Sequence, residues 1–421
     1  MAYDVSLLLQ QGRIFQHGQL SEPMDIAIAG DTIRAIAPHL DLTAATTLPL
    51  AGQLVIPPFV ESHIHLDSVL TAGQPRWNQS GTLFEGIEIW RERKQSLTVE
   101  DIQERAIAAL KIQASQGVLF VRTHADVSDP TLTPLHGLLS VREAVKDWIT
   151  VQVVAFPQDG IYSHPGTVER LEEAMKLGAD VVGGIPHYEL TREDGVRSVK
   201  YIFDLAETYD RLIDIHCDEI DDDQSRFLEV IAAEAIRRDM GDRVTASHTT
   251  AFGSYNNAYA FKLMGFLRRA RINFVSNPLI NLTLQGRMDT YPKRRGLTRV
   301  KELWQNGLNV SLGHDCIQDP WYCLGTGNLL DVALMAVHAC QMTGHDELQA
   351  CVQMVTENGA RTLNLHHAYG IAEGQPANLV VLDAEDAIAA LQHRATARHV
   401  ISQGQPLVST TPPQVTWQQV V

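Results

Sequence analysis

The stretch QLVIPPFVESHIHLD, residues 53–67, is a short apolar run that ends in two histidines. Seven further runs of this kind follow it, and segments with helical periodicity separate them, as over residues 98–117, 168–178 and 225–241. Short apolar strands that alternate with helices are typical of βα units and a parallel sheet. Eight such repeats predict a closed (β/α)8 barrel. The predicted strands lie within residues 53–67, 118–127, 150–158, 179–187, 212–219, 243–250, 272–280 and 308–315.

An open, doubly wound α/β sheet is the competing architecture. It commonly carries G-x-G-x-x-G after the first strand, or the phosphate-binding G-x-x-x-x-G-K-[ST]. Neither motif occurs in this sequence. The three helical segments named above end at Gly117, Gly178 and Gly241, and glycine suits a helix C-terminus. The barrel is therefore the favoured fold.

The two ends of the chain have a different pattern, in which polar and apolar residues alternate in short runs. Residues 5–15 and 24–38 read as antiparallel strands with a turn at Gly30 and Asp31, and residues 377–385 and 395–409 are also strand-like. These last runs follow the final convincing helix, near residues 361–365. We expect both ends to form one small β-sandwich domain, from residues 1–55 and 371–421, beside a barrel over residues 56–370.

Composition and charge limit the function classes. The 421 residues are 45% hydrophobic and 20% charged, as in a soluble globular protein. Lys and Arg number 34 against 50 Asp and Glu, a net charge of −16, which argues against nucleic acid or an anionic membrane surface as a partner. The first apolar run stops at Leu9, too short for a signal peptide or membrane helix. Five scattered cysteines without C-x-x-C spacing fit a reducing cytoplasm.

Polar side chains follow the predicted strands, where a barrel gathers them at one mouth. His63 and His65 lie two apart on a strand and so point to the same side. His216, His248 and Asp315 end three of the later runs. Imidazoles with a carboxylate and no thiolate suit one divalent cation, Fe(II) or Zn(II). The pattern therefore predicts a metal site.

The segments that carry these residues also resemble a known family. ESHIHLD (61–67), HCDEIDD (216–222), ASHTT (246–250) and GHD (313–315) occur in the order seen in the amidohydrolase superfamily. Longer strings, such as residues 71–88, 284–296 and 313–322, resemble its bacterial cytosine deaminase branch, and the likeness extends over about residues 50–370. The resemblance implies a distorted TIM-like barrel, a free nucleobase as substrate and a homo-oligomer. The metal ligands that it implies are His63, His65, His216 and Asp315.

The resemblance also implies roles for other residues. Glu219 matches the proton shuttle, His248 the residue that orients the attacking water, Gln158 the glutamine that reads the pyrimidine amide edge, and Trp321 an aromatic residue at the pocket mouth. Binuclear members need a lysine after the fourth strand, and this sequence has none there, which predicts a single metal. Such a metal lowers the pKa of bound water from 15.7 to about 7 and supplies hydroxide for attack on C4. Asp315 is then expected to accept the proton of that water, and Glu219 to protonate N3 and later help deliver a proton to the leaving ammonia.

One departure bears on the substrate. Cytosine deaminases of this branch usually have a second aspartate after the metal-binding one, beside C5 of the base, where this chain has Cys316. A thiol is smaller and uncharged, so it leaves room for a methyl group that would desolvate and crowd a carboxylate. We therefore predict that the enzyme converts 5-methylcytosine to thymine and ammonia, and cytosine less well, in pyrimidine salvage.

Several alternatives remain open from the sequence. The same residues are compatible with a cytosine deaminase in which Cys316 is neutral, with isoguanine as substrate, or with hydrolysis of a cyclic amide. Action on bases within DNA is disfavoured, because the P-C-x-x-C half of the H-x-E and P-C-x-x-C signature is missing. A scaffold barrel without activity is the alternative from another class. Structural hydrogen bonding is the expected role of His124, His187 and His314.

Overall fold

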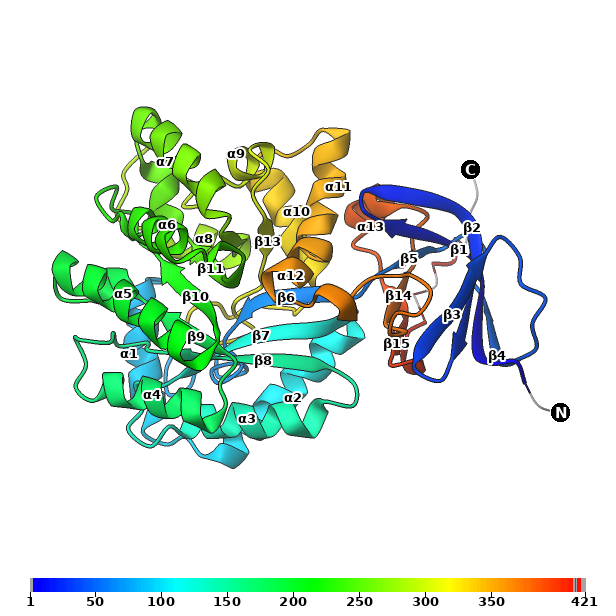
Figure 1. The fold of residues 1–421 in the computed structure, drawn as a ribbon, viewed down its shortest axis with the longest axis horizontal. Coiled ribbons are helices and arrows are strands. Elements are labelled where there is room, and N and C mark those ends of the chain that lie inside the picture. Colours follow the sequence, from blue (N-terminus) through cyan, green and yellow to red (C-terminus); the bar gives the residue numbers. More distant parts are fainter. Residues whose placement is uncertain (1–2, 412, 414, 418–421) are drawn as a thin grey trace.

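Two eight-stranded sheets organise the chain, and they lie beside each other in the computed structural model (Figure 1). The structure describes residues 3–411, 413 and 415–417. One sheet is the barrel, and the other is a separate sheet formed by both ends of the chain. This confirms the predicted barrel with a small β domain built from the two termini.

All eight predicted runs form barrel strands, each parallel to the next along the chain. Most of their residues are buried, because the barrel fills one face of each strand and helices cover the other. The strands are β6 (Phe59–Ile64), β7 (Val118–Asp126), β8 (Thr150–Phe156), β9 (Val181–Gly184), β10 (Leu212–Cys217), β11 (Val244–His248), β12 (Asn273–Ser276) and β13 (Val310–Leu312).

The barrel is distorted at the seam between β6 and β13, where the first and last strands pair only through a bridge between Ile64 and Asp315. A short helix, α12 (Glu357–Thr362), occupies the rest of the seam. Val60 N donates to the carbonyl of Val355 at 2.9 Å, and Asn358 Nδ2 donates to the carbonyl of Val310 at 2.9 Å. The α12 segment thus satisfies backbone groups that the parted strands leave unpaired.

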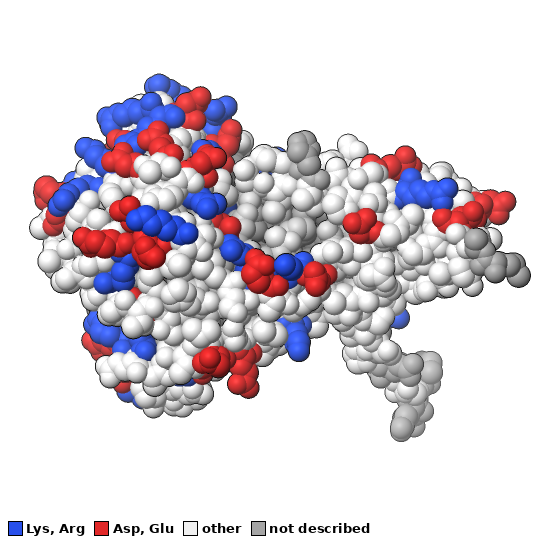
Figure 2. All heavy atoms as spheres, turned by 60° about the horizontal axis from the view of Figure 1, so that its bottom comes forward, with Lys and Arg blue, Asp and Glu red and all other residues white. Residues whose placement is uncertain are grey.

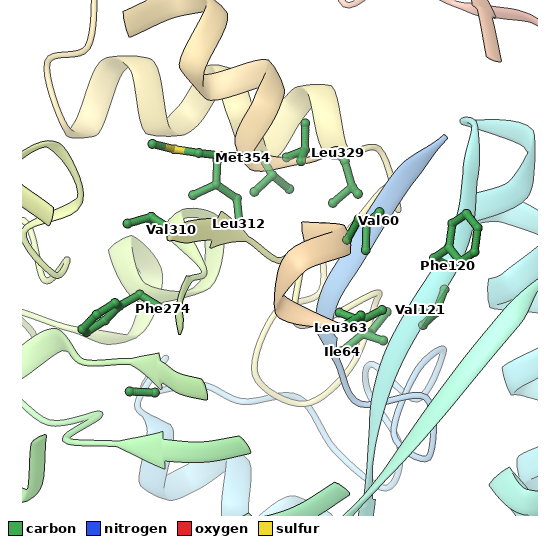
Figure 3. Packing of buried hydrophobic residues seen from close by; sticks show 14 of the residues in the cluster. Val60, Ile64, Phe120, Val121, Phe274, Val310, Leu312, Leu329, Met354 and Leu363 are labelled. Carbon is green, nitrogen blue, oxygen red and sulfur yellow. The ribbon is translucent and has the colours of Figure 1, made fainter. Parts of the chain in front are cut away.

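Close packing holds α12 in that seam. A Cβ added to Gly359 would lie 2.8 Å from Val60 Cβ, so only glycine permits this approach. Figure 3 shows Leu363, directly after α12, near Ile64 of β6, and both belong to the main hydrophobic core. The seam therefore closes by packing at one end and by hydrogen bonds at Asp315 at the other.

The small domain has one continuous mixed sheet in the order β16-β15-β14-β5-β1-β2-β3, with β4 paired to β1. Gly30, with φ +63°, lies in the predicted turn between β2 and β3. The C-terminal segment also contains a helix, α13 (Ala387–His393), so the expectation that the final helix lies near residues 361–365 is wrong. The strands are β1 (Val5–Gln16), β2 (Gln19–Ala29), β3 (Thr32–Ala37), β4 (Ala44–Pro49), β5 (Leu54–Ile56), β14 (Leu379–Leu382), β15 (Ala397–Ser402) and β16 (Gln405–Ser409).

Helices surround the barrel, and one of them, α1, is an additional helix between β6 and the helix that precedes β7. The helix predicted to end at Gly178 does so, but the one predicted to reach Gly241 ends at Arg238, because Asp239 adopts the left-handed conformation. Besides α12 and α13, the α-helices of the described residues are α1 (Leu83–Lys94), α2 (Val99–Ser115), α3 (Thr133–Val145), α4 (Thr167–Leu177), α5 (Arg192–Tyr209), α6 (Phe227–Arg238), α7 (Asn257–Ala270), α8 (Pro278–Leu284), α9 (Val300–Gln305), α10 (Leu329–Ala339) and α11 (His345–Met354).

The surface mixes charges of both signs. Figure 2 shows acidic and basic side chains interspersed over the helical layer of the barrel on this face. No helix among the described residues has the length and apolar character that crossing a bilayer requires.

Candidate active site

The carboxyl ends of β6, β10 and β11 and the loop after β13 bring the predicted metal-site side chains together. His65 Nε2 lies 3.1 Å from His216 Nε2. One carboxylate oxygen of Asp315 lies 3.6 Å from His63 Nε2 and 3.7 Å from His65 Nε2. Its other oxygen lies 3.8 Å from His248 Nε2. Side chains that are far apart in the sequence therefore converge on one region at the barrel mouth.

The backbone holds two of these residues in an unusual conformation. Asp315 has φ 69° and His248 has φ 65°, in the left-handed region that residues other than glycine rarely adopt. Asp315 N donates to the carbonyl of His63 at 2.8 Å, and His65 N donates to the carbonyl of Asp315 at 3.1 Å. The bonds that close the barrel thus also orient three predicted ligands, and strained residues of this kind concentrate at functional sites.

The donor set fits a divalent cation. Burial, the largest cause, and neighbouring imidazoles hold the pKa values of His63, His65 and His216 well below the ordinary value, so their rings are neutral. Both ring nitrogens of His63 are buried without a hydrogen-bond partner among the described residues. Donor atoms around a tetrahedral zinc lie roughly 3.3 Å apart, given bonds of about 2.0–2.1 Å. The distances of 3.1–3.7 Å between these donors match that spacing.

Glu219 and His248 lie beside this donor set. Glu219 Oε1 is 3.2 Å from His248 Nδ1. Burial raises the pKa of Glu219 to about 8, so this carboxyl group holds a proton at neutral pH. Burial likewise lowers the pKa of His248 to about 3. The amide groups of Asn281 and Asn277 lie 3.1 Å and 3.3 Å from His248 Nδ1 and restrain its ring.

A small cavity opens directly on these groups, and the three predicted substrate-binding residues line it. The side-chain amide of Gln158 has no hydrogen-bond partner among the described residues, although the residue is buried. Trp321 Nε1 is buried and also has no hydrogen-bond partner in the described part of the chain. Cys316 is 3% exposed and packs with Ile280 and Leu284. The lining residues are His65, Leu83, Ile87, Gln158, Ile185, His216, Glu219, His248, Ile280, Leu284, Asp315, Cys316 and Trp321.

Some residues of the site escaped the sequence analysis. Glu61 is fully buried, and its Oε1 accepts from the backbone N–H groups of His63 at 3.2 Å and His314 at 2.9 Å. It therefore ties the β6 ligand strand to the loop that carries Asp315. Phe156 stacks on the His216 ring at 4.0 Å between centroids. A carboxylate within an apolar strand was a signal for Glu61, but Phe156 has the pattern of an ordinary core residue.

The three histidines that were expected to make structural hydrogen bonds differ from one another. His314 Nε2 accepts from the backbone N–H groups of Thr326 at 3.3 Å and Gly327 at 3.1 Å, which is structural bonding. His124 Nδ1 lies 3.3 Å from the Ile64 carbonyl, and its ring lies 4.1 Å from that of His63. Its donor atoms also approach those of His63 and His65 closely enough to share a cation. Both ring nitrogens of His187 are buried without a hydrogen-bond partner among the described residues, so the expectation of structural hydrogen bonding is wrong for this residue.

Comparison with known proteins places this geometry in context. A profile of the amidohydrolase family matches residues 47–408. The crystal structure of 5-methylcytosine deaminase from Klebsiella pneumoniae, liganded with 5-fluorocytosine, is 48% identical and superposes with a TM-score of 0.94. The alignment covers 97% of this chain and 99% of that one. The same enzyme liganded with phosphonocytosine gives a TM-score of 0.93.

More distant relatives carry other activities. N-isopropylammelide isopropyl amidohydrolase from Pseudomonas sp. (strain ADP) is 28% identical over 97% of this chain and 98% of its own length. Pterin deaminase from Rhizobium rhizogenes is 27% identical over 92% of this chain and 88% of its own length. Their names differ in the molecule that is acted on, which is N-isopropylammelide in one and a pterin in the other.

Proposed function

This chain belongs to the amidohydrolase family and is a hydrolytic deaminase, and from this premise we propose that it converts free 5-methylcytosine to thymine and ammonia. The observation that carries the proposal is the buried, uncharged Cys316 next to Asp315, within an apolar wall formed by Ile280 and Leu284. The 48% identity to the 5-methylcytosine deaminase of Klebsiella pneumoniae supports it. Cytosine is the second substrate that we propose, with a lower kcat/KM.

The residues that would hold the metal are His63, His65, His216 and Asp315. The donor atoms of His65 and His216 lie 3.1 Å apart, and those of His63 and His65 lie 3.6 Å and 3.7 Å from Asp315. When bound, Fe(II) or Zn(II) supplies hydroxide at neutral pH. The neutral imidazoles present lone pairs to such a cation without first losing a proton. We propose one ion rather than two, because the fourth strand, β9, ends without a lysine.

Glu219 is the proton donor in this proposal. Its carboxyl group is protonated at neutral pH, since burial raises its pKa to about 8. It can therefore protonate N3 of the base, which makes C4 electrophilic, and the resulting carboxylate can take up the second proton that the attacking oxygen loses and pass it to the ammonia that leaves. Asp315 takes the proton of the attacking water, and His248, restrained by Asn281 at 3.1 Å, orients that water.

Gln158 and Cys316 select the base. An amide both donates and accepts, which matches the alternating carbonyl and N–H groups of a pyrimidine edge, and Gln158 has no competing protein partner among the described residues. Burying a methyl group stabilises the complex by only about 0.8 kcal/mol. Relief from desolvating and crowding a carboxylate beside C5 is thus the larger contribution of Cys316.

A substrate panel tests the proposal. Ammonia release is measured with 5-methylcytosine, cytosine and isoguanine for the wild type, Cys316→Asp and the control Cys323→Asp, which changes an exposed cysteine. We expect Cys316→Asp to lower the kcat/KM ratio of 5-methylcytosine to cytosine by about tenfold or more, and Cys323→Asp to leave it unchanged. A wild-type preference for cytosine that Cys316→Asp does not alter would contradict the proposal.

Three further expectations remain predictions. They are the homo-oligomeric state, the cytoplasmic location and the domain boundaries at residues 55 and 370.

A further inference from the structure

Asp218, between the predicted ligand His216 and the predicted proton donor Glu219, is fully buried yet does not line the cavity. Its Oδ1 accepts from Ser225 Oγ at 2.6 Å and from Phe227 N at 3.1 Å. Its Oδ2 accepts from Leu228 N at 3.0 Å and from the Tyr255 hydroxyl at 3.3 Å. The carboxylate thus points away from the cavity and into the protein.

These bonds cap the N-terminus of α6 from a distance. The residue at the N-cap position, Arg226, makes no side-chain cap hydrogen bond. The first N–H groups of a helix need acceptors, and a negative charge there is favourable because of the helix dipole. Asp218 provides both for Phe227 and Leu228, although it lies well before the helix in the sequence. The helix and the strand-end turn are therefore joined through one side chain.

The backbone of Asp218 is held from the opposite direction. Its φ is 51°, in the left-handed region. Its carbonyl accepts from Ala251 N at 3.0 Å and from Thr250 Oγ1 at 3.0 Å, both from the segment after β11. Side chain and carbonyl are thus fixed at the same time, which fixes the direction in which the chain leaves β10 toward Glu219.

Glu219 itself has few restraints. Its closest polar contact is His248 Nδ1 at 3.2 Å, and its carboxyl group has no hydrogen bond from a backbone N–H group among the described residues. The direction of its side chain therefore depends on the turn that precedes it. A displacement of about 1 Å in a reacting group can lower the rate by about 100-fold.

We propose that Asp218 is a positioning residue that aims Glu219 at the substrate by anchoring the turn after β10 to the N-terminus of α6. This proposal rests on the proposed function, in which Glu219 moves protons to and from the base. Asp218 acts through Glu219, so its contribution belongs to proton transfer rather than to base binding or to metal retention.

A double-mutant cycle tests this role. Asp218→Asn, Glu219→Gln and the double variant are compared with the wild type for kcat and KM on 5-methylcytosine and cytosine, and for metal bound per chain. Asparagine also tolerates the left-handed conformation, so the substitution removes the Oδ2 acceptor while it keeps the backbone. Asp223→Asn is the matched control, because Asp223 is an exposed member of the same acidic run.

We expect Asp218→Asn to lower kcat by about 10- to 100-fold, with KM within about twofold and metal content unchanged. In the Glu219→Gln background the same substitution should change kcat by less than about twofold, because the group that it positions is already disabled. Ser225→Ala removes the 2.6 Å donor and should give a smaller loss with the same dependence, which keeps the test available if Asp218→Asn does not fold.

Equal losses of kcat in both backgrounds, or a loss that follows metal content, would overturn the positioning role and leave the proposed function intact. A Glu219→Gln variant with wild-type kcat would instead overturn the proposed role of Glu219, and that of Asp218 with it. Asp223→Asn should match the wild type throughout.

Discussion

The effect of the substitution Gly86→Ala, on α1, on stability and substrate binding can be worked out from the contacts of this residue. A Cβ at this position would lie 2.3 Å from Trp321 Cδ1 and 2.5 Å from its Nε1. Carbon atoms in contact need about 3.5 Å, so the indole would have to move by about 1.2 Å in Gly86→Ala. Because Trp321 lines the cavity, this movement would change the pocket itself.

The expected stability is the sum of two effects. Alanine is about 0.5–1 kcal/mol more favourable than glycine within a helix, whereas overpacking of this kind costs about 1–3 kcal/mol. Gly86→Ala should therefore lower the free energy of unfolding by up to about 2.5 kcal/mol. The control is Gly265→Ala in α7, where an added Cβ meets nothing within 4 Å and only the helix gain of about 0.5–1 kcal/mol applies.

Urea unfolding and steady-state kinetics measure both effects. We expect Gly86→Ala to raise KM for 5-methylcytosine about tenfold and Gly265→Ala to leave KM unchanged. The reasoning is refuted if both variants are stabilised equally and Gly86→Ala keeps the wild-type KM, because Trp321 would then adapt without cost.

Three other predictions concern the chemistry and its pH dependence. Glu219→Gln should lower kcat by about 10²- to 10⁴-fold with little change in the free energy of unfolding, and a fully active variant would contradict proton transfer through this residue. Removal of metal by a chelator should abolish ammonia release and lower the free energy of unfolding by about 3 kcal/mol. Addition of Zn(II) or Fe(II) should restore both the activity and the stability. Undiminished activity in metal-free protein would contradict this prediction. Burial lowers the pKa of His314 from 6.5 to about 4, so the unfolded chain binds a proton between these values that the folded chain does not. The neutral ring should thus contribute about 3 kcal/mol of stability, which is complete above pH 6.5 and is lost as the pH falls toward 4. Over this pH range the free energy of unfolding should fall less for the metal-free His314→Gln variant than for the metal-free wild type. Parallel plots of the free energy of unfolding against pH for the two proteins would contradict this prediction.

Much of the fold could be predicted because strand and helix patterns are local. Each apolar run of the barrel is short enough to be recognised within its own segment, and all eight became parallel strands in sequence order. Polar residues directly after those runs indicated the site, because parallel strands place their carboxyl ends at one mouth. His63, His65, His216 and Asp315 follow that rule, and they converge in the structure.

Other features depend on contacts between segments that are remote in the sequence, and no local pattern predicts which segments meet. The α12 segment enters the barrel seam because Gly359 allows a close approach to Val60, hundreds of positions earlier. Asp218 caps a helix that begins well after it, and Glu61 joins two ligand segments that lie on or just after the first and the last strand of the barrel. Periodicity indicates which face of an element is buried but not which element packs against that face. The contacts of α12, Asp218 and Glu61 are therefore determined only by the packing of the whole chain.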